Sequence, residues 1–376
     1  MSSIIDYIYW RGDLSFDAFP PTEVDGLIFS AFSYMRFPQM VKNDFSASIR
    51  IQDLAEHFFS EPEEKQREAI RNENDLILFK LMASTPRYAD VEVLAYQSIL
   101  DTEKEVQFAA YTFKLNHLFH AVVYRGTDTT VIGWKEDLNL SFIDDLPGQQ
   151  YARDYLAYVA KNTLGNLIVC GHSKGGNLAV YAAASVTPRT QKRIHTVYNY
   201  DGPGFMKHFL EKPGYNSILS KIETLVPKSS VVGMLLEHEE PYEVVNSTNI
   251  GISQHEPYSW EVLGPSFVKD TELDMSSRIV DESLHVWLAG LSREDREKFC
   301  TAIHSICMES KPEKLVDLVK PQNAMTILKT FGETDETTRT MILSTLSALG
   351  KAMADTMSKR SLSAMHPQFG LPKKEA

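Results

Sequence analysis

The stretch LIVCGHSKGGNL, residues 167–178, constrains the fold more than any other part of this chain. Its apolar run predicts a short buried strand, and the small apolar residues that follow predict a helix. Gly171, Ser173 and Gly175 stand at the sharp turn between the two. A serine in such a turn takes strained backbone angles, and side chains two residues before and after it would meet neighbouring strands. Glycine is therefore needed on both sides of the serine.

Strands and helices alternate around this turn. Two β-rich runs, 106–113 and 117–125, predict a hairpin before it. After it, IHTVYNY (194–200), IETLV (222–226) and YEVV (242–245) are short apolar runs that predict further strands. Such alternation is typical of a mostly parallel sheet with helices on both faces.

The five residues 171–175, Gly-His-Ser-Lys-Gly, fit the nucleophile elbow of α/β-hydrolases. The helix that begins after such an elbow offers free backbone N–H groups and a positive dipole end to a developing oxyanion. We therefore expect Ser173 to be a nucleophile on an α/β-hydrolase fold. The expected architecture is a mostly parallel central sheet with helices on both faces, plus helical additions at the N- and C-terminal ends.

A nucleophilic serine needs a base and an orienting acid, which in this fold follow it in the order serine, acid, histidine. His255 lies in a turn-like loop after the last expected strand, so it is the expected base, with His238 as the alternative. Asp201 comes just past the strand that follows the elbow helix, at the sheet edge where the serine stands. It is the expected acid, and Glu237 and Glu239 are the alternatives.

Composition limits the class of partner. The net charge is −12 and no basic cluster occurs, which argues against nucleic acid or an anionic membrane surface as the main partner. The first residues lack the pattern of a secretory signal, and no stretch reaches about 18 uninterrupted apolar residues. We expect a cytoplasmic protein without stable membrane insertion.

Cys170, Cys300 and Cys307 are the only cysteines of the 376 residues, and no Cys-x-x-Cys spacing occurs. Neither a disulfide framework nor a zinc site is expected from them. Serine-based hydrolysis requires no metal and no organic cofactor, so we expect none.

The patterns divide the chain into three parts. Residues 1–280 are the expected hydrolase domain, with a mostly helical part at 1–104 and the catalytic sheet and elbow at 105–280. Helical patterns return after that point and predict a helical C-terminal region over 281–360. The last residues, 361–376, are expected to form a flexible tail.

Two blocks resemble the fungal-type triacylglycerol lipases, lipase class 3. VVYRGTDTTVIGWKEDLNLSF (122–142) is similar to that family's Phe-Arg-Gly-Thr/Ser segment, and VCGHSKGGNLAVYAAA (169–184) to its Gly-His-Ser-Leu-Gly-Gly-Ala elbow. The resemblance covers roughly residues 105–260. The whole chain, including residues 6–34 and YNYDGPGF (198–205), also resembles a family of poorly characterised bacterial lipase-like serine hydrolases.

The resemblance implies roles for individual residues. Ser173 matches the nucleophile, and Lys174 and Thr127 match the residues whose backbone N–H groups form the oxyanion hole, Thr127 often adding its hydroxyl. Trp134 and Asp137 match scaffold that braces the oxyanion loop. The implied activity is lipase-like cleavage of a small-molecule or lipid ester.

The chain departs from the lipase pattern in two places. Fungal-type lipases carry their acid after a later strand, but the corresponding ETLVPKSSVVGMLLEH (223–238) has serines there. YNYDGPGF instead resembles the Asp-Pro-x-Gly-Pro segment of pancreatic and lipoprotein lipases, which favours Asp201. In addition, Lys174 replaces the usual leucine, and an ammonium beside the serine would disfavour a wholly apolar acyl surface. A thioesterase, a small-molecule carboxylesterase and a non-catalytic scaffold protein stay open as alternatives.

Overall fold

The computed structural model describes residues 2–37, 39–101, 103, 105–127, 131–312, 317, 318 and 320–365. The strands in this part of the chain are β1 (Ile49–Arg50), β2 (Glu92–Asp101), β3 (Val106–Lys114), β4 (Phe119–Tyr124), β5 (Asn166–His172), β6 (Ile194–Tyr200), β7 (Ile222–Pro227), β8 (Tyr242–Val245), β9 (Val262–Leu263), β10 (Ser266–Phe267) and β11 (Lys269–Asp270). The α-helices are α1 (Ile4–Arg11), α2 (Glu23–Phe32), α3 (Ile51–Ser60), α4 (Glu63–Glu68), α5 (Glu73–Ser84), α6 (Val131–Asn139), α7 (Pro147–Asn162), α8 (Lys174–Ser185), α9 (Pro188–Arg193), α10 (Lys207–Leu210), α11 (Pro213–Ile218), α12 (Met275–Ala289), α13 (Arg293–Met308), α14 (Pro321–Glu333) and α15 (Glu336–Met365). Short 3-10 turns are η1 (Leu219–Lys221), η2 (Val232–Met234), η3 (Gly251–His255) and η4 (Pro257–Ser259).

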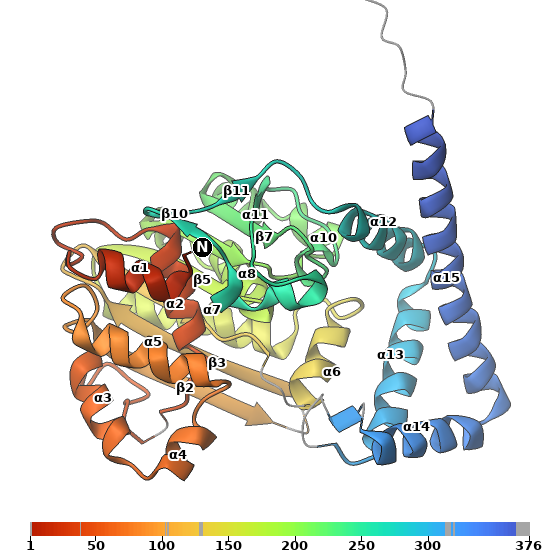
Figure 1. Cartoon of the computed structure of the whole chain (residues 1–376), viewed down its shortest axis with the longest axis horizontal. Helices are drawn as coiled ribbons and strands as arrows, with labels where there is room; N and C mark the ends of the chain where they lie inside the picture. Colours follow the sequence, from red (N-terminus) through yellow and green to blue (C-terminus); the bar gives the residue numbers. More distant parts are fainter. Residues whose placement is uncertain are drawn as a thin grey trace, which may run out of the picture.

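One twisted sheet organises the fold (Figure 1). Its strands lie in the order β1-β2-β3-β4-β5-β6-β7-β8-β11. The pairs from β4 to β8 are parallel, whereas β1 to β4 and the β8–β11 pair are antiparallel. Because the parallel strands share one direction, the segments that leave β5, β6 and β7 emerge at the same edge of the sheet.

Helices cover both faces of this sheet. On one face, α2 packs on β4, β5 and β6, and the aromatic core there includes the other N-terminal helices. On the opposite face, α7 and α8 pack on β3 to β6, joined by α11. Successive side chains of β5 point to opposite faces of the sheet. Ile168 and Cys170 face the first core, and Leu167 and Val169 face the second. The expected α/β-hydrolase architecture, a mostly parallel sheet between helical layers, is confirmed.

The N-terminal part holds a strand that the sequence patterns did not predict. β2 is the antiparallel neighbour of β3 and has a register shift between Leu94 and Gln97, where Ala95 has a φ of 51°. This bulge interrupts the strict alternation of buried and exposed residues by which a strand is recognised. The expected hairpin at 106–125 is confirmed as β3 and β4.

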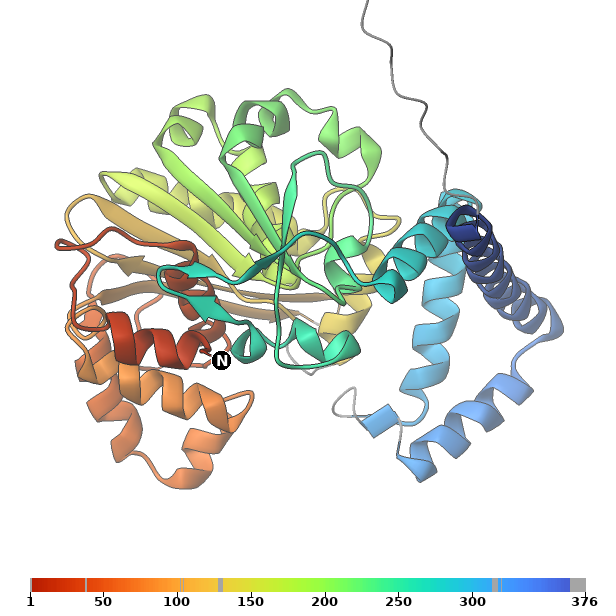
Figure 2. The same ribbon diagram turned by 45° about the horizontal axis from the view of Figure 1, so that its top comes forward.

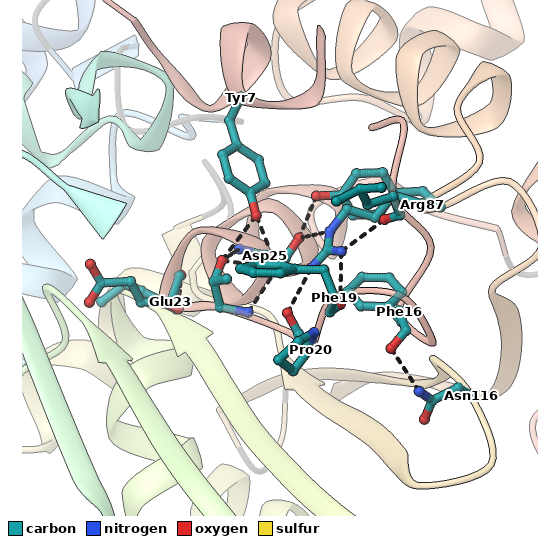
Figure 3. Close-up of polar contacts among 12 residues, drawn as sticks. Tyr7, Phe16, Phe19, Pro20, Glu23, Asp25, Arg87 and Asn116 are labelled. Atoms are coloured by element: carbon teal, nitrogen blue, oxygen red, sulfur yellow. Dashed lines mark hydrogen bonds and ion pairs between the residues drawn. The ribbon is translucent and has the colours of Figure 1, made fainter. Parts of the chain in front are cut away.

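A buried ion pair fastens the N-terminal helical layer (Figure 3). Arg87 donates from Nε and Nη2 to the two carboxylate oxygens of Asp25, at 2.8 and 2.6 Å, and both side chains are almost fully buried. Tyr88 donates its hydroxyl to the same carboxylate at 2.6 Å. The guanidinium also donates to backbone carbonyls before α2, which are those of Leu14, Phe19 and Pro20. This network holds the loop between α1 and α2 against the segment that leads into β2.

Replacing Arg87 with methionine is expected to lower the free energy of unfolding by about 3–5 kcal/mol, because Asp25 would remain buried without its counter-charge. The matched control is Arg50→Met, which breaks an exposed pair with Asp53 and is expected to leave the free energy of unfolding nearly unchanged, because water screens exposed charges. Urea unfolding followed by far-UV circular dichroism measures both. Equal small losses in the two variants would contradict a structural role for the buried pair.

The C-terminal helices α12 to α15 form a group at one side of the sheet, next to α6 (Figures 1 and 2). α13 begins with a capping box in which Ser292 and Asp295 bond each other's backbone N–H groups. The predicted domain boundary at 280 falls inside α12, and the predicted tail at 361–376 overlaps the end of α15, while residues 366–376 lie outside the described residues. None of the described helices combines the length and hydropathy needed to cross a membrane.

Candidate active site

Ser173 stands in the strained turn that the glycine pattern predicts. It joins β5 to α8 with φ 59° and ψ −135°, a region that non-glycine residues rarely adopt. A side chain on Gly171 or Gly175 would begin only 2.2 Å from a backbone oxygen, that of Gly175 or of Tyr124 respectively. Any larger residue at either position would therefore push β4 or the first turn of α8 away. The turn leaves Ser173 half-exposed at the end of the sheet.

His255 and Asp201 are hydrogen-bonded. The Nδ1 atom of His255, in η3, lies 2.6 Å from Oδ2 of Asp201, and this carboxylate is fully buried. The other oxygen, Oδ1, accepts bonds from the hydroxyl of Ser230 and from the N–H of Gly233. Because donors occupy both oxygens, the carboxylate has one orientation toward the imidazole.

The backbone places Asp201 beside the elbow. Asp201 directly follows β6, has φ 51°, and donates its N–H to the carbonyl of Leu225 in β7 at 2.8 Å. The next residue, Gly202, lies so close to Ser173 that an added Cβ would be 2.5 Å from the serine carbonyl oxygen. Asp201 and Ser173 therefore share one edge of the sheet, as the strand order requires.

A second contact, which sequence reasoning missed, holds the backbone of His255. His172, the residue before the nucleophile, lies with Nε2 2.7 Å from the carbonyl oxygen of His255 and with Nδ1 2.9 Å from the hydroxyl of Tyr34. Burial lowers the pKa of His172 well below its ordinary value, so the ring is neutral. We assign the proton to Nε2, which donates to the carbonyl, while Nδ1 accepts from Tyr34. No sequence signal marks this contact, since Tyr34 lies 138 residues before His172.

The rings of His172 and His255 are neighbours, with centroids 4.5 Å apart. Among the described residues, no hydrogen bond joins the Ser173 hydroxyl to the His255 imidazole; Ser173 is bonded through its backbone, to Tyr200 and Gly176. The imidazole of His255 therefore lies beside His172, the residue before Ser173, and is bonded to Asp201.

Two backbone N–H groups flank the serine. Lys174 is the first residue of α8, a position whose N–H has no partner inside the helix. On the other side, a Cβ on Gly126 would lie 3.1 Å from the Cβ of Ser173, so the loop with Thr127 runs directly past the nucleophile. Both residues named for an oxyanion hole therefore adjoin Ser173.

The side chain of Thr127 is bonded to Asp137 in α6. Its hydroxyl lies 2.8 Å from each carboxylate oxygen, so α6 holds this side chain. Burial raises the pKa of Asp137 to about 6, against the opposing effects of Lys174, the Thr127 hydroxyl and the more distant His255. Asp137 thus braces the loop, as the lipase resemblance implies. The side chain of Trp134, named with it, lies outside the described residues.

The side chain of Lys174 corrects one sequence inference. Its ammonium does not face the site beside Ser173. It is buried and donates to Oε2 of Glu136 at 2.8 Å and to the carbonyl of Gln107 at 3.1 Å. The same carboxylate accepts the backbone N–H groups of Gln107 and Gly148. Because the charge is neutralised behind the elbow, Lys174 does not argue against an apolar acyl group at the serine.

The alternative acid and base lie elsewhere. His238 bonds through Nδ1 to Glu240 at 2.9 Å. Burial alone would raise the pKa of Glu240, but hydrogen bonds from His238, Tyr215 and Thr224 lower it to about 2. Glu237 and Glu239 are exposed, and the backbone of Glu237 pairs with that of Phe205. The structure does not bring Glu237 to His255.

A model of the Mbeg1-like family matches residues 82–305, more than half of the chain. The chain belongs to the Mbeg1-like family. The Mbeg1-like match contains Ser173, Asp201 and His255 and extends through α12 into α13. No curated protein matches the chain. Within the described residues, no group of three or more His, Cys, Asp or Glu side chains is placed to hold a metal ion.

Several solved lipase structures are similar to this Mbeg1-like chain at low identity. The Rhizomucor miehei lipase in its propeptide complex is 14% identical, with 70% of this chain and 91% of that chain covered and a TM-score of 0.35. A mutant form of MDLA from Penicillium cyclopium is 15% identical, with coverages of 67% and 87% and a TM-score of 0.38. M37 lipase is 16% identical, with coverages of 56% and 69% and a TM-score of 0.37.

Proposed function

We propose that this protein is a serine hydrolase that cleaves carboxylic esters through an acyl-enzyme, with Ser173, His255 and Asp201 as a lipase-like catalytic triad. The observation that carries the proposal is the 2.6 Å bond between His255 and the buried Asp201, at the sheet edge where the elbow presents Ser173. A catalytic imidazole needs an oriented carboxylate, which selects its tautomer and stabilises its charged form. A histidine that is merely exposed at the surface has no such need.

In the first step, Nε2 of His255 takes the proton of the Ser173 hydroxyl as the oxygen attacks the ester carbonyl. The missing hydrogen bond between serine and histidine is compatible with this role, since such bonds are often loose without substrate and tighten in the complex. The N–H groups of Lys174 and Thr127 receive the oxyanion, helped by the N-terminal end of α8. The imidazolium then protonates the departing alcohol.

In the second step, water hydrolyses the acyl-enzyme with His255 again as the base, and the carboxylic acid leaves. The neutral His172 keeps the carbonyl of His255 in place throughout, since burial disfavours its protonated form. The substrate in this proposal is a small-molecule or lipid ester. A thioester substrate would use the same machinery.

Covalent labelling tests the proposal without knowledge of the natural ester. The full chain is expected to take up one fluorophosphonate group, located by mass spectrometry on the peptide that contains Ser173, and to hydrolyse a short p-nitrophenyl ester. Labelling should disappear when the protein is first denatured, because the reactivity of the serine depends on the folded base and oxyanion hole. A folded protein that takes up no label and cleaves no ester would identify a non-catalytic scaffold instead.

A further inference from the structure

A cavity of about 150 Å³ lies between the hydrolase sheet and the C-terminal helices. Its lining is almost entirely apolar and comes from two parts of the chain that are far apart in sequence. α6 and the loops after β6 and β7 form one wall, and α12 and α13 form the other. Figures 1 and 2 both show α13 beside α6.

The sheet-side wall comes from segments that also hold residues of the candidate active site. Asp137, which accepts the Thr127 hydroxyl, lines the cavity itself. Pro203 lines it two residues after Asp201, and Leu235 lines it two residues after Gly233, whose N–H bonds that acid. The cavity lining therefore includes Asp137, which holds the oxyanion loop, and residues two positions after Asp201 and Gly233.

The opposite wall is built by side chains of α12 and α13. Trp287 and Phe299 meet edge to face, with ring centroids 5.7 Å apart, and Leu288 lies beside them. The indole N–H of Trp287 is bonded to the carbonyl of Thr345 in α15, which leaves the apolar part of the ring for the cavity. Arg296 ties the two walls together, donating to the carbonyls of Ser141 at 2.9 Å and Leu288 at 2.6 Å.

We infer that this cavity binds the acyl chain of the ester, so that the C-terminal helices form part of the substrate site. The inference rests on the proposed function. The cavity shares Asp137 with the oxyanion loop and Pro203 with the segment that follows Asp201, so it adjoins the place of an ester bound at Ser173. A partly open apolar space of this volume suits a small hydrocarbon group, since a cavity of about 150 Å³ lined by similar residues binds benzene. The occupant is an acyl chain of about six carbons.

Chain-length preference is the first measurable consequence. Each methylene that enters an apolar cavity is expected to raise kcat/KM about fourfold. The hexanoyl p-nitrophenyl ester, with four more methylenes, should therefore exceed the acetyl ester by about 250-fold in kcat/KM. Chains beyond about eight carbons should bring no further gain, because the space is filled.

A filling variant tests the location of the chain. Leu288→Trp is expected to lower the ratio of kcat/KM for the hexanoyl ester to kcat/KM for the acetyl ester by about tenfold or more. Val286→Trp is the matched control, since Val286 lies on the same helix, is 57% exposed and does not line the cavity. Melting temperatures of both variants show whether the helices stay packed. An unchanged hexanoyl-to-acetyl ratio in a folded Leu288→Trp protein would overturn the inference.

Binding of hexanoate separates this inference from the proposed function. Titration calorimetry of the full chain is expected to show hexanoate binding that Leu288→Trp weakens about tenfold or more and Val286→Trp preserves. Hexanoate that binds wild type and Leu288→Trp equally, or does not bind wild type, would place the acyl chain elsewhere. Absence of ester hydrolysis together with cavity-dependent hexanoate binding would refute the hydrolase and retain the cavity as an acyl-binding site.

Discussion

Replacing Ser173 with alanine is expected to reduce kcat for ester hydrolysis by about a million-fold, to the level that binding and the oxyanion hole alone support. The elbow holds the serine oxygen where the substrate carbonyl comes, and no described residue offers a second hydroxyl in such a turn. Alanine fits the same backbone, since the change removes one oxygen and leaves the Cβ. The loss should appear in p-nitrophenyl ester kinetics and in fluorophosphonate labelling.

Ser185→Ala is the matched control for that experiment. Ser185 ends the same helix, α8, at the opposite end from the nucleophile. Its replacement should leave kcat within about twofold of wild type, because surface substitutions away from special features change little. Turnover and labelling that persist in a folded Ser173→Ala protein would place the chemistry at another residue.

Replacing Asp201 with asparagine is expected to lower kcat by about ten-thousandfold through the wrong histidine tautomer. In the wild type, one carboxylate oxygen faces Nδ1 of His255, and the other accepts from Ser230 and Gly233. Asparagine has a single acceptor oxygen, which is expected to accept the bonds from Ser230 and Gly233. Its amide nitrogen then faces Nδ1 and stabilises the tautomer with a proton on Nε2, which cannot take the proton of the serine.

Glu237→Gln is the control that separates the two candidate acids. Glu237 is exposed and, among the described residues, has no hydrogen bond to His255, so its replacement should leave kcat near wild type. The measurement is kcat of both variants at neutral pH, with melting temperatures to show that each is folded. The reverse pattern, with Asp201→Asn active and Glu237→Gln impaired, would move the acid to Glu237.

The proposed acid, Asp201, follows β6, and the segment after β7 contributes to its surroundings. In fungal-type lipases the acid follows a later strand, where this chain has serines. One of these, Ser230, donates its hydroxyl to Asp201. Ser230, which follows β7, therefore holds the carboxylate of Asp201, which follows the neighbouring strand β6. Because β6 and β7 are parallel neighbours, either strand end reaches the same imidazole.

The features that could be predicted are those with local physical causes. The elbow is one, because the need for Gly171 and Gly175 comes from sterics within and beside a single turn. The parallel sheet is another, since short apolar strands that alternate with helices have few other arrangements. The bulged β2 was missed because its pattern is irregular and its pairing with β3 is what defines it.

Sequence by itself therefore determined the nucleophile candidate, the order of serine, acid and base, and the class of fold. Tertiary structure alone decided which way Lys174 points, that His172 and Tyr34 hold the carbonyl of His255, and that α12 and α13 line a cavity together with Asp137. The physical reason is distance along the chain. A turn's sterics depend on adjacent residues, whereas the partner of a buried charge or imidazole is chosen by segments that only the packed sheet brings together.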